Sequence, residues 1–231
     1  MINPKHKKVG VFGIQGSGKT YFVEHSLINS FKKPFIYLMH PEDFTSCKNN
    51  VSVYVPYKIV RGKKIIDRSV QHLDRVMGKF IELAKQGKHD AFILDEASTF
   101  LPKDLRTLQK EAPNIIDAID SHRHYGKKKG EGFSFVYMAR RLQSLPTELV
   151  ETTAFIFVFA MEGKNAIDHL KGIHQDFKEL LKELSIENHK FILKELGKAP
   201  QIYQATKLKE QNAKNGKTKS KKDFIDDENR S

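Results

Sequence analysis

A glycine-rich segment, residues 13–20, carries the residue types that hold a phosphate chain. It reads GIQGSGKT and fits G-x-x-x-x-G-K-[ST] at every fixed position. Glycines permit the backbone angles and close approaches by which successive N–H groups surround an anion, and the start of a following helix favours the same charge. The lysine reaches the terminal phosphates, and the final hydroxyl joins a Mg²⁺ shell. The segment therefore predicts a triphosphate site with Mg²⁺.

The flanks of this segment decide between a phosphate site and an ordinary glycine turn with a solvated lysine. An apolar strand, Lys8–Phe12, precedes it, and a helix is expected from Thr20 to Phe31 with an apolar face. This context favours the phosphate site. The residues expected to bind nucleotide are Gly13, Gln15, Gly16, Ser17, Gly18, Lys19, Thr20 and Tyr21, with Thr20 also a metal ligand.

A second acidic motif follows about 75 residues after the loop. Residues 91–96 read AFILDE, four apolar residues and then two acids. A buried strand of this kind delivers Asp95 to its carboxyl edge, where open α/β sheets bind ligands, so Asp95 is expected to hold the Mg²⁺ shell. Glu96 is placed to polarise a water molecule as general base. Alone, the segment would be an ordinary buried strand that ends at a polar turn; its pairing with the loop favours hydrolysis.

The nucleotide and the reaction class follow from what accompanies these motifs. No N-K-x-D segment is present to specify guanine, and ENHK at 187–190 differs from it, so ATP is the expected nucleotide. A nucleotide kinase would need an arginine-rich lid. The loop Gly126–Gly132, GKKKGEG, offers only lysines. We therefore expect an ATPase rather than a kinase.

The apolar segments alternate between strand and helix patterns, which predicts an α/β fold with a twisted, mainly parallel sheet flanked by helices. Further strands are expected at 34–39, 51–55, 58–66, 91–94, 133–138 and 155–159, with 190–193 and 201–204 as a closing pair. Helices are expected from an Asp67 cap to about Gln86, from Pro113 to about Tyr125, and over Asn165–Leu184. Residues 1–206 are expected to form one ATPase domain, and the lysine-rich residues 207–231 a disordered tail.

Composition bounds the partners and the compartment. The 231 residues carry 40 Lys and Arg against 28 Asp and Glu, a net charge of +12, which favours a polyanion such as nucleic acid. A lysine-rich proteome is the other source of such a charge. The lone Cys47 fits a reducing compartment and has no metal-ligand neighbours. Neither a signal peptide nor a membrane span is apparent, so a cytoplasmic protein is expected.

The order of the segments before and after the acidic pair resembles the HerA/FtsK superfamily of DNA-translocating ATPases, which have a RecA/FtsK-like P-loop fold. The resemblance covers roughly residues 7–205. The likeness is to its small viral genome-packaging and filamentous-phage assembly branches. In that family an Arg-His loop precedes the next strand, and the strand ends in a polar sensor, followed by an x-L-P-x-x-L helix. The matching positions here are Arg123-His124, then Arg140-Arg141 or Gln143, then Leu145-Pro146.

Arginines suit this chemistry because γ-phosphoryl transfer spreads negative charge over the phosphate oxygens. Arg140 or Arg141 is the expected sensor within the subunit, and Arg123 the expected finger acting on a neighbouring subunit; a surface salt bridge is the alternative for each. Lys127, Lys128 and Lys129 would suit a backbone contact with DNA, or equally a solvated turn.

The resemblance implies an ATP-driven motor that packages double-stranded DNA into a viral capsid. Its expected partners are the DNA backbone, identical subunits in a ring, and a capsid or vertex protein. It would act in the host cytoplasm, with virion association as a second location. Two alternatives stay open: a filamentous-phage-type assembly ATPase, and an ATP-dependent switch such as a helicase loader.

Overall fold

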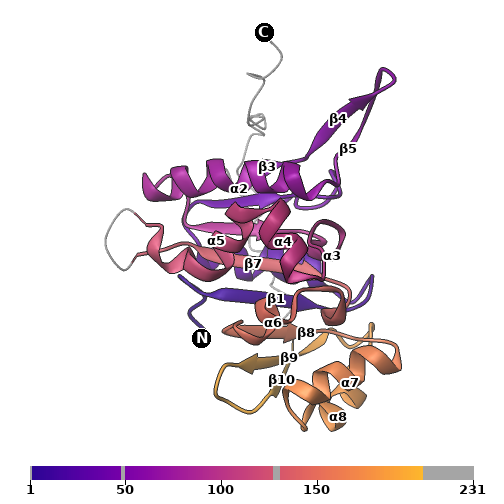
Figure 1. The fold of residues 1–231 in the computed structure, drawn as a ribbon. Coiled ribbons are helices and arrows are strands. Elements are labelled where there is room, and N and C mark those ends of the chain that lie inside the picture. The colour runs from indigo at the N-terminus through magenta and orange to yellow at the C-terminus, as the bar shows by residue number, and fades with distance from the viewer. Residues whose placement is uncertain (1, 48–49, 127–130, 205–231) are drawn as a thin grey trace, which may run out of the picture.

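The order of strands in the main sheet places the two nucleotide motifs near each other. The structure, a computed structural model, describes residues 2–47, 50–126 and 131–204. Eight strands form one sheet in the order β10-β9-β8-β1-β7-β6-β2-β3 (Figure 1). Their bounds are β1 Lys8–Phe12, β2 Pro34–Tyr37, β3 Ser52–Tyr54, β6 Ala91–Leu94, β7 Ser134–Ala139, β8 Phe155–Val158, β9 Lys190–Glu195 and β10 Gln201–Gln204. In this order, each pair of adjacent strands from β8 through β1, β7, β6 and β2 to β3 is parallel. The strand β9 is antiparallel to both of its neighbours, β8 and β10.

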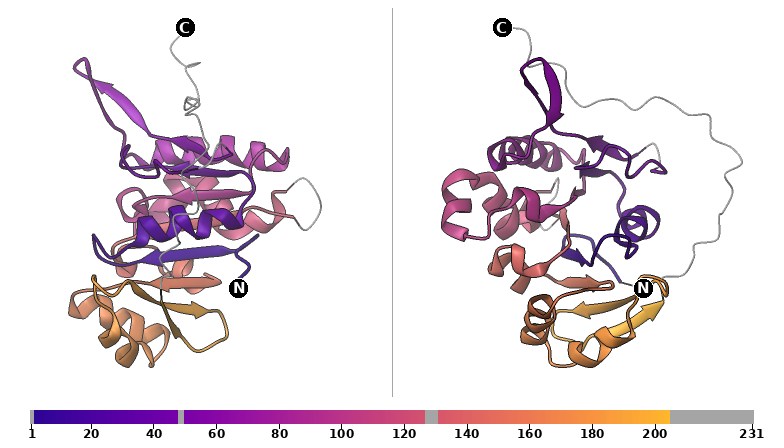
Figure 2. Two further views of the ribbon diagram at one scale, coloured as in Figure 1. Left: turned by 180° about the vertical axis from the view of Figure 1, so that it is seen from behind. Right: turned by 90° about the vertical axis from the view of Figure 1, so that its right-hand side faces the viewer.

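Helices cover the two faces of this sheet unequally (Figure 2). One face packs against α2 (Val70–Lys85), α3 (Ala97–Phe100), α4 (Leu105–Glu111), α5 (Pro113–Ser121) and α6 (Thr147–Glu151). The other face packs against α1 (Lys19–His25) and the 3₁₀ turn Leu27–Ser30. All residues of β1, β2, β6, β7 and β8 are buried, as their near-continuous apolar runs predicted. The expected mainly parallel α/β fold is confirmed.

The helix expected from Thr20 to Phe31 is wrong in its second half. The α-helix ends at His25, and Ser26 leaves helical geometry with φ −121° and ψ −64°. The side-chain amide of Asn29 donates to the carbonyl of His25 at 2.8 Å. This bond satisfies one carbonyl at the helix end, and the chain continues as the 3₁₀ turn.

The helix expected over Asn165–Leu184 is also interrupted. It comprises α7 (Lys164–Ile173), α8 (Phe177–Leu180) and a 3₁₀ turn, Leu181–Glu183. His174 is extended at the break, with φ −161° and ψ 132°. The side chain of Phe177 just beyond it is fully buried, so tertiary packing decides this boundary rather than helix periodicity.

The segment expected to be one strand over 58–66 is a hairpin that stands away from the body (Figures 1 and 2). Its strands are β4 (Tyr57–Val60) and β5 (Lys63–Ile66), paired antiparallel. Arg61 and Gly62 connect them with φ 49° and 75°, the left-handed geometry of tight two-residue hairpin loops. The Arg-Gly pair lacks the usual Asn-Gly signal, which explains the missed turn.

The cap expected at Asp67 is wrong by two residues. The helix α2 begins at Val70 with Ser69 in the N-cap position. Asp67 instead accepts a hydrogen bond from the N–H of Ser69 at 3.0 Å and lies 3.4 Å from both Lys58 Nζ and His72 Nδ1. It therefore joins the root of the hairpin to the first turn of α2.

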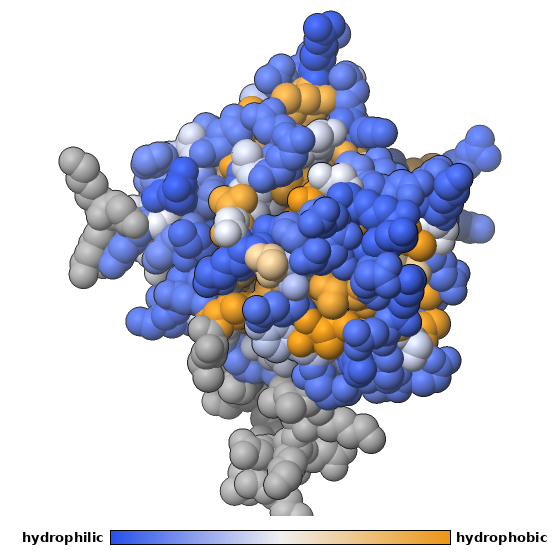
Figure 3. Space-filling view, turned by 90° about the horizontal axis from the view of Figure 1, so that it is seen from below, coloured by the Kyte–Doolittle hydropathy of each residue, from blue (hydrophilic) through white to orange (hydrophobic). Residues whose placement is uncertain are grey.

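The β10 end of the sheet carries apolar surface among polar side chains when the molecule is seen from below (Figure 3). The exposed large apolar residues in this part of the chain are Ile186, Leu196 and Tyr203. None of the helices in the described ranges is both long and apolar enough to cross a membrane.

Candidate nucleotide site

The phosphate loop leaves the carboxyl end of β1 and enters α1 directly. The N–H of Ile14 donates to the carbonyl of Ala160 at 2.9 Å, which ties the loop to the chain just after β8. A Cβ on Gly13 would lie 2.7 Å from Ser17 Oγ and 2.8 Å from Phe159 Cβ. Gly18 has φ 95° at the N-cap of α1. Only glycine satisfies both positions, so the loop geometry depends on them.

Lys19 is held inside this loop rather than extended into solvent. Its Nζ donates to the carbonyl of Ile14 at 2.8 Å, and the residue is buried. Burial lowers the pKa of Lys19, and the nearby carboxylate of Glu96 acts in the opposite direction. The ammonium group thus lies beside the acidic motif, in a setting where an anionic phosphate would favour its charged form.

The acidic pair follows β6 as expected, at the same edge of the sheet. Asp95 is 3% exposed, and its Oδ2 accepts from the N–H of Met39 at 3.3 Å. Burial, then the charge of Glu96, raises the pKa of Asp95 to about 6. Glu96 adopts the left-handed region with φ 47° and ψ 50°. A non-glycine residue in this region is strained, and such strain concentrates at functional sites.

Glu96 is paired with Arg140, which follows the last residue of β7. The Nε of Arg140 donates to Glu96 Oε1 at 3.1 Å. The two side chains meet because β7 is the neighbour of β6 and lies between β6 and β1. In this arrangement the candidate general base lines the edge of the sheet with one carboxylate oxygen, Oε1, bound to an arginine. The sequence indicated both residues but not their contact.

One cavity of about 440 Å³ joins these residues. Its walls include the expected residues Gln15, Gly16, Gly18, Lys19, Thr20, Tyr21, Asp95, Glu96 and Arg140. Gly13 and Ser17 belong to the loop but do not line the cavity; the Ser17 hydroxyl donates to the carbonyl of Ile14 at 2.8 Å. The structure therefore brings most of the expected site residues together.

The cavity also includes residues that the sequence reasoning missed. His40, Glu42 and Asp43 form part of its wall, together with Met138 and Ala139. Burial raises the pKa of Asp43. His40 to Asp43 follow β2, whose carboxyl end lies beside that of β6, so position at a shared sheet edge was the available signal.

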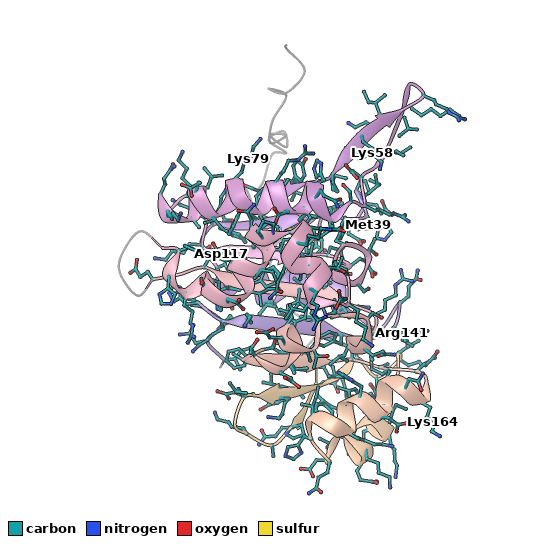
Figure 4. The ribbon with its side chains drawn as sticks, in the orientation of Figure 1. Met39, Lys58, Lys79, Asp117, Arg141 and Lys164 are labelled. Carbon is teal, nitrogen blue, oxygen red and sulfur yellow. The ribbon has the colours of Figure 1, made fainter. Side chains whose placement is uncertain are left out.

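The other two arginines lie elsewhere. Arg141 is exposed and does not line the cavity, although it lies at the same edge of the sheet as Met39 (Figure 4). Gln143, the other sensor candidate, has a buried Oε1 without a hydrogen-bond partner among the described residues. Arg123 lies in the turn after α5, where the carbonyl of His122 accepts from Phe133 N at 3.0 Å. That is the edge where β7 begins, opposite the phosphate loop.

Thr20 and Asp95 provide the oxygen groups that a magnesium ion would need. Both line the cavity, and the Asp95 carboxyl is buried beside a second acid. Mg²⁺ takes oxygen ligands and is commonly held by one or two protein groups together with substrate phosphates. Burial, and then repulsion from Glu96, raise the pKa of Asp95, and a bound divalent cation would favour its charged form against both effects, so this donor set fits the ion.

Comparison with known proteins identifies the fold. No protein-family model and no curated protein matches the sequence. The genome packaging NTPase B204 of Sulfolobus turreted icosahedral virus 2, in complex with ATP-gammaS, matches with a TM-score of 0.66 at 19% identity over 88% of this chain and 98% of that chain. B204 of Sulfolobus turreted icosahedral virus, a DNA-packaging ATPase, matches with a TM-score of 0.66 at 17% identity over the same shares. The pCW3 conjugation coupling protein TcpA, with ATPgS, matches with a TM-score of 0.56 at 11% identity over 88% of this chain and 61% of that chain. These likenesses confirm the expected resemblance at the level of architecture: the chain has the P-loop NTPase fold of viral packaging NTPases.

Proposed function

We propose that the chain hydrolyses ATP and uses the energy to move double-stranded DNA, as a viral genome-packaging motor. The observation that carries the ATPase part is one cavity lined by Lys19, Thr20, Asp95, Glu96 and Arg140. These residues supply a cation for the phosphates, oxygen ligands for a metal, a carboxylate base and an arginine for the transition state. A triphosphate hydrolase needs this set.

In the proposed reaction, the phosphate loop and Lys19 hold the β- and γ-phosphates. When bound, Mg²⁺ would neutralise phosphate charge, with Thr20 and Asp95 as its protein ligands. Glu96 accepts a proton from the attacking water, whose oxygen bonds to the γ-phosphorus as the bond to the bridging oxygen breaks. In the structure Arg140 is bound to one oxygen of this carboxylate, Oε1. The γ-phosphate is the anion that can compete for the arginine, so we assign the sensor role to Arg140.

The DNA and ring parts of the proposal rest on charge and on arginine placement. The net charge of +12 suits a polyanion. Arg123 lies at the sheet edge opposite its own cavity, so it would reach a phosphate in a neighbouring subunit, as a ring of identical subunits requires. The solved structures with this fold include DNA-packaging proteins, which supports the choice of substrate.

Other parts of the proposal concern position and partners. Residues 1–206 form the proposed ATPase domain, and the host cytoplasm, beside a capsid or vertex protein, is the proposed place of action. The expected DNA contact at Lys127–Lys129 and the expected disordered tail at 207–231 lie outside the described residues.

The experiment that tests this function measures ATP hydrolysis with and without linear duplex DNA, and particle mass by light scattering in each nucleotide state. We expect turnover to require Mg²⁺, to rise with DNA, and to accompany ring formation. A hydrolysis rate that is the same with and without DNA, in a protein that stays monomeric with every nucleotide, would contradict the proposal of a DNA motor. Tight ATP binding with no turnover under any condition would instead indicate a nucleotide switch.

A further inference from the structure

The projecting hairpin β4–β5 is strongly basic. Its ten residues, 57–66, read YKIVRGKKII and contain no acidic residue. Four of the ten are cationic: Lys58, Arg61, Lys63 and Lys64. All four are exposed. Such a density of one charge sign on a projecting element is not explained by packing within the chain.

The same hairpin exposes large apolar side chains. Ile59 is 72% exposed, Val60 42% and Ile65 41%. These side chains lie on both faces of the hairpin. Ile59 pairs with Lys64 on one face. On the other face Val60 pairs with Lys63, and Ile65 pairs with Lys58. Each face therefore presents an apolar side chain next to a cation.

The cations differ in what holds them. Lys58, at the root (Figure 4), is 3.4 Å from Asp67, and Lys64 Nζ lies 4.1 Å over the ring of Tyr57. Arg61, Lys63 and Lys64 form no ion pair within the described ranges. The charge near the tip is thus available to an anionic partner.

The root of the hairpin is fixed near the nucleotide edge of the sheet. The N–H of Asp67 donates to the carbonyl of Pro56 at 2.9 Å and closes the hairpin at its base. The hairpin follows β3, whose Tyr54 carbonyl accepts from Leu38 N at 2.8 Å. The next residue along, Met39, donates to Asp95. A contact made by the hairpin is therefore rooted close to the acidic motif.

We propose that the hairpin β4–β5 contacts duplex DNA, with Arg61, Lys63 and Lys64 on the phosphates and Ile59 in the groove. This inference rests on the proposed DNA function and assigns it a site. A two-stranded ribbon fits the major groove of B-DNA, and phosphates match the charge at the tip. In the major groove an apolar side chain can contact the methyl group of thymine, and Ile59 is the most exposed apolar side chain of the hairpin.

The test measures binding of a fluorescent 30-base-pair duplex by anisotropy over a range of salt concentrations. The variant replaces Arg61, Lys63 and Lys64 with serine. Its matched control replaces three exposed lysines at the other end of the sheet, Lys178, Lys182 and Lys198. We expect the hairpin variant to bind about tenfold or more weakly at low salt, with the slope of log K against log salt reduced by about 3. The control should change both by much less.

A second variant separates groove contact from charge. Ile59→Ala should weaken binding while the salt slope stays as in the wild type. Circular dichroism and basal ATP hydrolysis, measured for each variant, check that the protein remains folded. Wild-type protein that binds no duplex would refute the DNA function itself. If the wild type binds duplex DNA and the hairpin variant binds it equally well, the hairpin site is refuted but the DNA function is not. If the hairpin variant instead loses self-association, the hairpin makes contacts between copies of the chain.

Discussion

The buried histidine at position 122 should make the protein sensitive to acid. His122 is 3% exposed and packs edge-on against Phe133. Burial, and then the positive charge of Lys8, lower the pKa of His122 to about 4 from an ordinary value of 6.5. Arg123 adds to this effect.

The sign and size of the effect follow from linkage. Between pH 6.5 and 4 the unfolded chain binds a proton at this residue and the folded chain does not, so stability falls as the pH falls. Each pH unit between the two pKa values is worth about 1.4 kcal/mol. The stability that depends on neutral His122 should therefore decrease by ~2.5 kcal/mol from pH 8 to pH 4.5. This decrease is a large fraction of the free energy of unfolding of a typical domain, which is roughly 5–15 kcal/mol.

Urea unfolding at pH 8 and pH 4.5 measures this loss in the wild type and in His122→Leu. Between pH 8 and pH 4.5 the free energy of unfolding of the variant should fall by ~2.5 kcal/mol less than that of the wild type, since leucine takes up no proton. His124→Leu, the same change at an exposed histidine two residues away, is the matched control and should keep the wild-type profile. Parallel profiles for wild type and His122→Leu, or a His122 ring that titrates near 6.5 by NMR, would refute the reasoning.

Three further variants test the site. Lys19→Ala removes the cation nearest the loop, so nucleotide affinity measured by calorimetry should fall at least tenfold; unchanged affinity would contradict the placement of the phosphates. Arg140→Ala should lower kcat by about a hundredfold or more with a small change in KM, while unfolding shifts by less than about 1 kcal/mol because the pair with Glu96 is partly exposed. Gly13→Ala should destabilise the protein by roughly 1–3 kcal/mol because the new Cβ meets atoms closer than 3 Å, whereas Gly172→Ala in the open should be neutral or stabilising; equal melting temperatures for the two variants would contradict this.

The sequence predicted the central strands because both faces of the sheet are covered. A strand such as Ala91–Leu94 is then apolar throughout and stands out from its surroundings. Helix ends were less predictable, since they depend on single contacts. The Asn29 amide at the end of α1 and the burial of Phe177 beyond α7 are tertiary facts that periodicity does not contain.

The candidate site was predictable as two motifs but not as one geometry. Each motif carries its chemistry locally, in Lys19 or in Asp95. The contact between Glu96 and Arg140 depends on β7 lying beside β6, which is a property of strand order. For the same reason, residues 40–43 after β2 were not foreseen as part of the cavity.

The central claim, that Glu96 is the base of an ATPase, is tested most directly by Glu96→Gln. The substitution keeps size and hydrogen bonding but removes the proton acceptor. Steady-state phosphate release and equilibrium binding of ATP with Mg²⁺ should be measured on the same preparation. We predict that turnover falls by about a hundredfold or more while ATP affinity stays within a fewfold of the wild type. A variant that hydrolyses ATP at the wild-type rate would contradict the account.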